Sequence, residues 1–293
     1  LSFIFFSNAW ADEPIIVEEK RSIILFPLLT AIVPGLGQAI DGEYQKSGSL
    51  LGLSISGFLI ANEAHKRQEA FLASDSYRHH SYRDNVRAEL FGMTMYKHAA
   101  GVALYDSFLT RVQDYHREGK YLFLPEKQNL ESIHKAPFTF TYLSRPTTFL
   151  PLLLAFGLGI SEFNRSTKPD HFDLRMSDAA TSTYASYVAG VTEEAMFRGW
   201  MQPILYENTQ NVWLTNTIQA LAFGYSHATP QPYIQIAFGL YSGWLTPKNY
   251  WDLSESIFIH TWWDVIVITA EYARSRSKTK DFNVQLPMFN ASF

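Results

Sequence analysis

Charged residues are spread unevenly along the chain, and several long stretches contain no Asp, Glu, Lys or Arg. The longest extends from Asn208 to Pro247, roughly forty residues, which is enough for about two membrane-spanning helices. The others lie near the lower limit for a span, about 17 residues. They are 22–40, 47–62, 146–161 and 179–192. Polar residues within them favour helices that pack more on one another than on lipid. The pattern predicts an all-α, polytopic membrane helical bundle.

The same pattern predicts five segments. Turn signals at Pro34-Gly35 and Asp41-Gly42 separate two apolar runs near the N-terminus, which indicates a helical hairpin. Charged residues are concentrated in the middle of the chain, which favours a mostly helical region outside the membrane. The expected segments are a signal-peptide remnant at 1–11, a transmembrane helical hairpin at 12–62, a charged extramembrane region at 63–145, a motif-bearing intramembrane domain at 146–272 and a basic tail at 273–293.

Two features near the N-terminus have known counterparts. In residues 1–11 an apolar run ends in Ala9-Trp10-Ala11, as at the end of a secretory signal; a short apolar arm is the alternative. The turn around Pro34-Gly35 resembles that of small two-helix transmembrane domains. This resemblance implies membrane insertion and little about chemistry.

The composition of the chain excludes several kinds of partner and site. The formal net charge is −4, so nothing favours nucleic acid as a partner. Cysteine is absent, which removes a disulfide framework, a thiolate metal site and a cysteine nucleophile. Ionisable groups inside apolar stretches therefore become the main functional candidates.

The first such group is a Glu-Glu-x-x-x-Arg motif formed by Glu193, Glu194 and Arg198. Glu194 and Arg198 are four residues apart, so a helix places them on one face as an ion pair. Glu193 is rotated away from this pair and can face another partner. A carboxyl group removed from water suits a general base near neutral pH. The alternative is a purely structural network of the three charges.

Two further motifs contain histidine. Phe223 precedes His227 by one helical turn and can pack against it. His260 and Asp264 are also four apart and face the same way, like an imidazole oriented by a carboxylate. A buried structural histidine and a helix-linking hydrogen bond are the respective alternatives. Trp262 and Trp263 are expected to pack or to lie at an interface.

Together the three motifs resemble those of the CAAX protease and bacteriocin-processing (CPBP) family, which are intramembrane glutamic-type or metallo endopeptidases. The resemblance covers about 146–272. It implies that Glu193 activates the attacking water with help from His227. Glu194, Arg198 and Phe223 would support the site. His260 and Asp264 would stabilise the oxyanion or bind a metal.

The last motif departs from the family pattern. Prenyl-protein proteases of the family have Asn where this chain has Asp264, and an ionised Asp cannot donate a hydrogen bond to an oxyanion. A bacterial peptide or membrane protein is therefore expected as substrate. The motifs leave the need for a cofactor open, and His227 and His260 could help to hold a divalent metal such as Zn²⁺. A His-Glu-x-x-His helix, the usual zinc-peptidase signature, does not occur.

Three functions remain open. The first is an intramembrane endopeptidase in the bacterial cytoplasmic (inner) membrane, acting on a membrane-embedded or membrane-associated protein or peptide. The second is a non-catalytic membrane scaffold or immunity protein of the same fold, which the unusual 63–145 region favours. The third is a transporter with a proton-relay carboxylate cluster, which the small number of spans and the lack of an internal repeat disfavour. Because Glu193 and His227 occur together, the endopeptidase is the favoured function.

Overall fold

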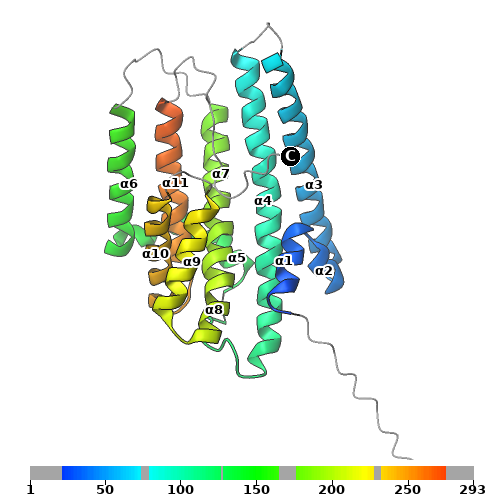
Figure 1. The fold of residues 1–293 in the computed structure, drawn as a ribbon, viewed down its shortest axis with the longest axis vertical. Coiled ribbons are helices and arrows are strands. Elements are labelled where there is room, and N and C mark those ends of the chain that lie inside the picture. Colours follow the sequence, from blue (N-terminus) through cyan, green and yellow to red (C-terminus); the bar gives the residue numbers. More distant parts are fainter. Residues whose placement is uncertain (1–21, 74–78, 127, 165–175, 228–231, 275–293) are drawn as a thin grey trace, which may run out of the picture.

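The computed structural model describes residues 22–73, 79–126, 128–164, 176–227 and 232–274, and every regular element within these ranges is helical (Figure 1). The expected all-α class is therefore confirmed. The expected signal remnant at 1–11 and nearly all of the expected tail at 273–293 lie outside these ranges. The elements are α1 (Leu25–Ile32), α2 (Leu36–Ile40), α3 (Tyr44–Ala73), α4 (His79–His116), α5 (Leu130–Lys135), η1 (Ala136–Phe138), η2 (Phe140–Ser144), α6 (Pro146–Asn164), α7 (Met176–Glu194), η3 (Ala195–Met201), α8 (Gln202–Thr209), α9 (Val212–Ser226), α10 (Tyr233–Lys248) and α11 (Ser254–Arg274).

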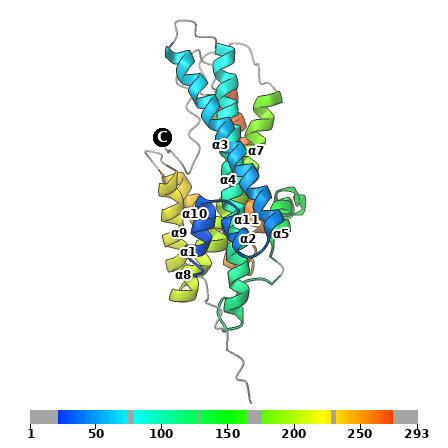
Figure 2. The ribbon, with the colours of Figure 1, turned by 90° about the vertical axis from the view of Figure 1, so that its right-hand side faces the viewer.

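The long helices α3, α4, α7, α11 and α6 run roughly alongside one another (Figures 1 and 2). Helices α3 and α4 pack closely because glycines face each other: a Cβ added at Gly57 would lie 2.5 Å from the carbonyl oxygen of Gly92. Helix α4 also packs on α7, and α7 packs on α11. The expected boundary between 62 and 63 falls inside α3, so the charged region begins as a continuation of that helix.

The expected N-terminal hairpin is a more broken structure. Gly35 and Gly42 have positive φ angles of 95° and 80°, which end one short helix after another. Helices α1 and α2 are consequently only 8 and 5 residues long, and α3 alone is long, at 30 residues. This segment is attached to α4, where Asp106 accepts hydrogen bonds from Gln38 Nε2 at 2.9 Å and Lys46 Nζ at 3.0 Å.

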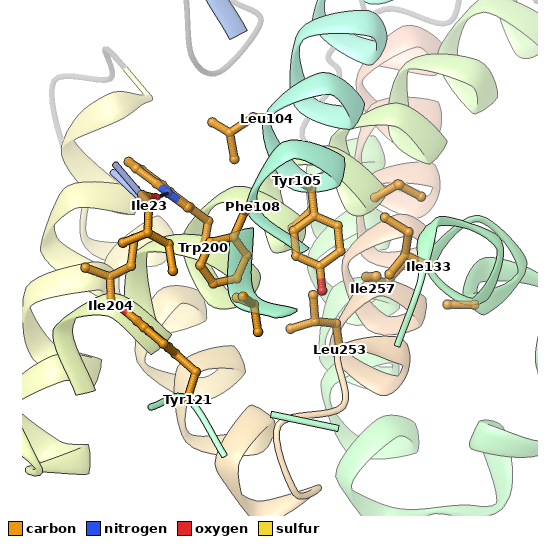
Figure 3. Close-up of a cluster of buried hydrophobic side chains, with 14 residues drawn as sticks. Ile23, Leu104, Tyr105, Phe108, Tyr121, Ile133, Trp200, Ile204, Leu253 and Ile257 are labelled. Carbon is orange, nitrogen blue, oxygen red and sulfur yellow. Dashed lines mark hydrogen bonds between the residues drawn. The ribbon is translucent and has the colours of Figure 1, made fainter. Parts of the chain in front are cut away.

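An aromatic and aliphatic cluster holds α4 against the C-terminal half of the chain (Figure 3). Tyr105 and Phe108 of α4 pack against Trp200 of η3. They also pack against Leu253, which immediately precedes α11, and Ile257, which lies within it. Each of these side chains is less than a tenth exposed, and burying one large apolar side chain stabilises a fold by about 1.5–3 kcal/mol. The cluster fixes the ends of α7 and α11 relative to each other.

The charge-free stretch from Asn208 to Pro247 is divided between two helices, α9 of 15 residues and α10 of 16. Helix α9 begins after Asn211, whose Oδ1 accepts a 3.0 Å hydrogen bond from Leu214 N and caps the helix. Across the described ranges, none of the helices combines the length and the apolar character that crossing a bilayer requires.

Candidate active site

The motif residues lie where α7 ends beside α9, α10 and α11. Glu193 and Glu194 are the last residues of α7 and are 1% and 0% exposed. The next seven residues, Ala195–Met201, form a π-helix, a rare widening that often accompanies functional sites. Helix α11 lies so close to α7 here that a Cβ added at Gly190 would be only 2.1 Å from Thr261 Oγ1. The approach brings the third motif against the first.

Glu194 and Arg198 form a fully buried ion pair, as their four-residue spacing predicts. Arg198 Nη1 donates to Glu194 Oε1 at 2.9 Å, and Nη2 donates to the carbonyl oxygen of Gly239 on α10 at 3.3 Å. The guanidinium carbon lies 4.3 Å from the ring centroid of Phe223, within cation–π range. Arg198 therefore joins α7, α9 and α10 at one buried point.

His260 is oriented by Glu194. Its Nδ1 donates to Glu194 Oε1 at 2.8 Å, which leaves Nε2 directed toward Glu193 Oε2 at 3.8 Å and Asp264 Oδ2 at 3.6 Å. The sequence pattern suggested that Asp264 orients this imidazole, whereas the hydrogen bond that the imidazole makes is to Glu194. Asp264 faces the reactive nitrogen instead, at a separation longer than a hydrogen bond.

His227 has a defined tautomer. Its Nδ1 lies 2.6 Å from the carbonyl oxygen of Phe223, which can only accept, so Nδ1 carries the proton. In the neutral ring Nε2 then has a lone pair, and it lies 3.7 Å from Glu193 Oε2. The Phe223 ring meets the imidazole edge to face, with centroids 4.5 Å apart. Phe223 thus fixes His227 through both its backbone and its ring.

Glu193 is the point on which both histidines converge. Its Oε2 is buried and has no hydrogen-bond partner among the described residues, while the two Nε2 atoms lie 3.7 and 3.8 Å away. The suggested metal ligands His227 and His260 both belong to this group. In the described part of the chain, however, no set of three or more His, Asp or Glu side chains has an arrangement that would hold a metal ion.

Some contributions to the site escaped the sequence analysis. Phe238 of α10 packs on His260, with ring centroids 4.8 Å apart, and also on Trp263 at 5.7 Å. Trp262 Nε1 donates to the carbonyl oxygen of Pro137 at 2.9 Å, so both tryptophans pack as expected. The sequence does contain a signal beside Phe238, the Gly239-x-x-x-Gly243 spacing, because small residues four apart indicate a close helix contact. The structure shows this contact, since a Cβ added at Gly239 would lie 2.9 Å from Ala220 Cα.

These residues define a buried carboxylate–imidazole site on a helical scaffold. The family model for Rce1-like proteins, type II CAAX prenyl endopeptidases, matches residues 176–266, less than a third of the chain. The match confirms the resemblance to CAAX proteases that the three motifs indicated, and it includes all of them. The family is one of proteases, and its members are membrane proteins. No curated protein and no solved structure was found to match the chain.

Proposed function

We propose that this protein is an endopeptidase that hydrolyses peptide bonds of a membrane-embedded or membrane-associated protein or peptide. One observation carries the proposal: the nitrogen lone pair of neutral His227 and the Nε2 of His260 both converge on the unpartnered Glu193 Oε2. At 3.7 and 3.8 Å both pairs are beyond direct hydrogen-bond distance, and we propose that a water molecule binds beside Glu193 Oε2 and the two histidines. Such a water is the nucleophile that peptide hydrolysis needs.

The water would be activated by two acceptors. It donates one hydrogen bond to Glu193 Oε2 and the other to His227 Nε2, and its oxygen then attacks the carbonyl carbon of the scissile bond. Its proton passes to Glu193 as the new C–O bond forms. Glu193 later returns that proton to the leaving amine nitrogen when the C–N bond breaks. Positioned general acid–base catalysis of this kind contributes typically about 10²–10⁴-fold.

His260 would stabilise the oxyanion. In its protonated form it donates from Nδ1 to Glu194 and offers Nε2–H to the developing negative charge on the carbonyl oxygen. Glu194 is itself held by Arg198, so the imidazole is oriented before the substrate arrives. Asp264 lies on the Nε2 side, where it supports the charged form of His260.

The site also has an apparent direction of access. The Asp264 side chain is 20% exposed, whereas that of Glu193 is 2% exposed. A peptide would approach past Asp264 and meet Glu193 at the end of the path. A buried carboxylate at the end and a partly exposed one at the entrance suit a substrate that presents an extended backbone.

The outward faces of several helices support a membrane setting. Helix α6 exposes Phe149, Leu150, Leu153 and Leu154, each more than half exposed, as a stripe along one side. Large exposed apolar residues also occur on α9, where Trp213 and Tyr225 are both 71% exposed. Extended apolar surface of this kind marks contact with a membrane or a partner. We propose that these faces contact lipid, in the bacterial cytoplasmic membrane that the motif resemblance implies.

The proposal is tested by comparing cells that carry wild-type protein or Glu193→Gln at matched expression, and mapping new peptide termini in their membrane proteomes. Glu63→Gln, an identical change at an exposed carboxylate, is the matched control. Termini present with wild type and Glu63→Gln and lost with Glu193→Gln would support peptidase activity and identify the substrate class. Identical termini in all three strains would reject it in favour of the non-catalytic scaffold or immunity protein.

A further inference from the structure

Helix α4 lies outside the matched segment 176–266, yet it borders the candidate site. It packs directly against α7 (Figures 1 and 2). At Gly101 an added Cβ would lie 2.4 Å from Cβ of Thr192, so the two helices touch almost backbone to backbone. Thr192 immediately precedes Glu193. Helix α4 therefore passes the site at very short range.

Lys97 lies on the side of α4 that meets this junction. It precedes Gly101 by four residues, and residues four apart in an α-helix share a face. The residue is half-buried, and its positive charge interacts electrostatically with the carboxylates of Glu193 and Asp264 and with the imidazole of His227. A lysine from the segment that sequence alone assigned to a solvated region is thus part of the electrostatics of the site.

With His260 protonated, the three carboxylates of the site still exceed the positive charges of Arg198 and His260 by one. Glu194 is paired with Arg198 at 2.9 Å. Glu193 and Asp264 both approach His260 Nε2, at 3.8 and 3.6 Å, so two carboxylates face one imidazole nitrogen. Like charges held this close in buried surroundings disfavour each other's ionised form. Lys97 acts on both carboxylates at once.

We propose that Lys97 is a positioning residue of this site, which balances the charges of Glu193 and Asp264 and thereby holds them around His260. Its catalytic consequence rests on the proposed function, whereas the charge coupling exists with or without peptidase activity. The effects of changing Lys97 and Asp264 should therefore depend on each other. Removing the lysine alone leaves two carboxylates repelling each other. Removing the charge of Asp264 alone leaves Glu193 as the carboxylate that Lys97 stabilises. The ionised form of Glu193 then becomes a weaker base.

A cycle of four proteins tests this coupling: wild type, Lys97→Met, Asp264→Asn and the double variant, each purified in detergent. Two quantities are measured, the midpoint of thermal unfolding and the rate of cleavage of a peptide spanning a mapped cleavage site. We expect each single change to lower the cleavage rate on the order of tenfold, and the double variant to lose clearly less activity than the product of the two single losses, as directly interacting groups allow. Lys97→Arg keeps the positive charge and should retain most activity.

The control pairs Lys97→Met with Asp252→Asn. Asp252 is exposed just before α11, where its Oδ1 accepts a 2.7 Å hydrogen bond from Ser254 N that an Asn can also accept. This pair should show no rescue. Additive effects of Lys97→Met and Asp264→Asn on both quantities, or a Lys97→Arg variant as impaired as Lys97→Met, would overturn the proposal. Coupled unfolding midpoints in a protein that cleaves nothing would support the charge pairing and reject the peptidase function.

Discussion

His260 Nδ1 donates a 2.8 Å hydrogen bond to Glu194 Oε1 across 66 positions of sequence. The same carboxylate oxygen accepts from Arg198 at 2.9 Å, so one buried atom connects the first motif to the third. The second glutamate of the Glu-Glu pair is therefore the residue that orients the imidazole. Glu193 keeps Oε2 directed toward the nitrogens of both histidines, and the adjacent glutamates have different tasks because successive helical residues point in different directions.

Arg198→Met should reduce stability far more than it changes the chemistry. The substitution leaves Glu194 as a buried carboxylate with no guanidinium, and breaking a buried ion pair in this way costs about 3–5 kcal/mol. We expect low accumulation of the protein in membranes and a lower unfolding midpoint, both measured against wild type. Arg67→Met, which breaks an exposed pair with Glu63, is the control and should change neither measurement appreciably.

Accumulation of Arg198→Met at the wild-type level would contradict this role for the pair. It would mean that the carboxylate of Glu194 is satisfied by other groups. Glu194→Gln in the Arg198→Met background then gives a second check, because removing both charges should recover part of the lost stability.

His227→Asn should slow cleavage strongly without unfolding the protein. The Asn amide can keep the donor that Nδ1 presents to the Phe223 carbonyl, while the Nε2 acceptor beside Glu193 is lost. Losing an acceptor that assists general-base catalysis is expected to slow cleavage about 100-fold or more. The measurement is cleavage of a peptide that spans a mapped site, together with the unfolding midpoint. His65→Asn, a change at a largely exposed histidine, is the control, and equal activity of the two variants would remove His227 from the mechanism.

Much of the site could be predicted from the sequence because it depends on helix periodicity. The four-residue spacings place Glu194 beside Arg198 and Phe223 beside His227 whatever the tertiary structure. The partner of His260 could not be predicted in this way. Spacing favours Asp264, which is one turn away, whereas the actual donor–acceptor pair with Glu194 depends on how α11 lies against α7.

Lys97 was missed for a related reason. It lies among charged residues that are typical of a solvated helix, and only the contact between Gly101 and Thr192 turns its side of α4 toward the site. In the N-terminal hairpin, the positive φ angles at Gly35 and Gly42 coincide with the two predicted turn signals, whereas the shortness of α1 and α2 was not predicted.

Leu154→Arg on α6 should impair membrane insertion if the exposed stripe of that helix contacts lipid. Leu154 is 58% exposed, and a charged side chain at the centre of a membrane helix costs about 2.5–3.5 kcal/mol. We expect wild type to resist extraction from membranes by alkaline carbonate and the variant to accumulate poorly or to be extracted. Leu154→Phe is the control, since it keeps an apolar surface. Full resistance of Leu154→Arg to extraction would place this face away from lipid.

Gly101→Ala and Gly52→Ala should have opposite effects on stability. Both residues lie inside helices, where Ala is favoured over Gly by about 1 kcal/mol. A Cβ at Gly52 meets nothing within 4 Å, so this variant should unfold at a slightly higher temperature than wild type. A Cβ at Gly101 would lie 2.4 Å from that of Thr192, and overpacking of this kind costs about 1–3 kcal/mol. The overlap should displace α7 and thereby lower the cleavage rate, because Thr192 adjoins Glu193.

A reciprocal exchange distinguishes this contact from a general loss of helix stability. Gly101→Ala combined with Thr192→Gly moves the Cβ from α7 to α4 and removes the overlap. The double variant should therefore be more stable than the sum of the two single changes predicts, and its cleavage rate should exceed that of Gly101→Ala. Strictly additive unfolding free energies would mean that α4 does not contact α7 at this point. The placement of Lys97 beside the site would then lack its geometric support.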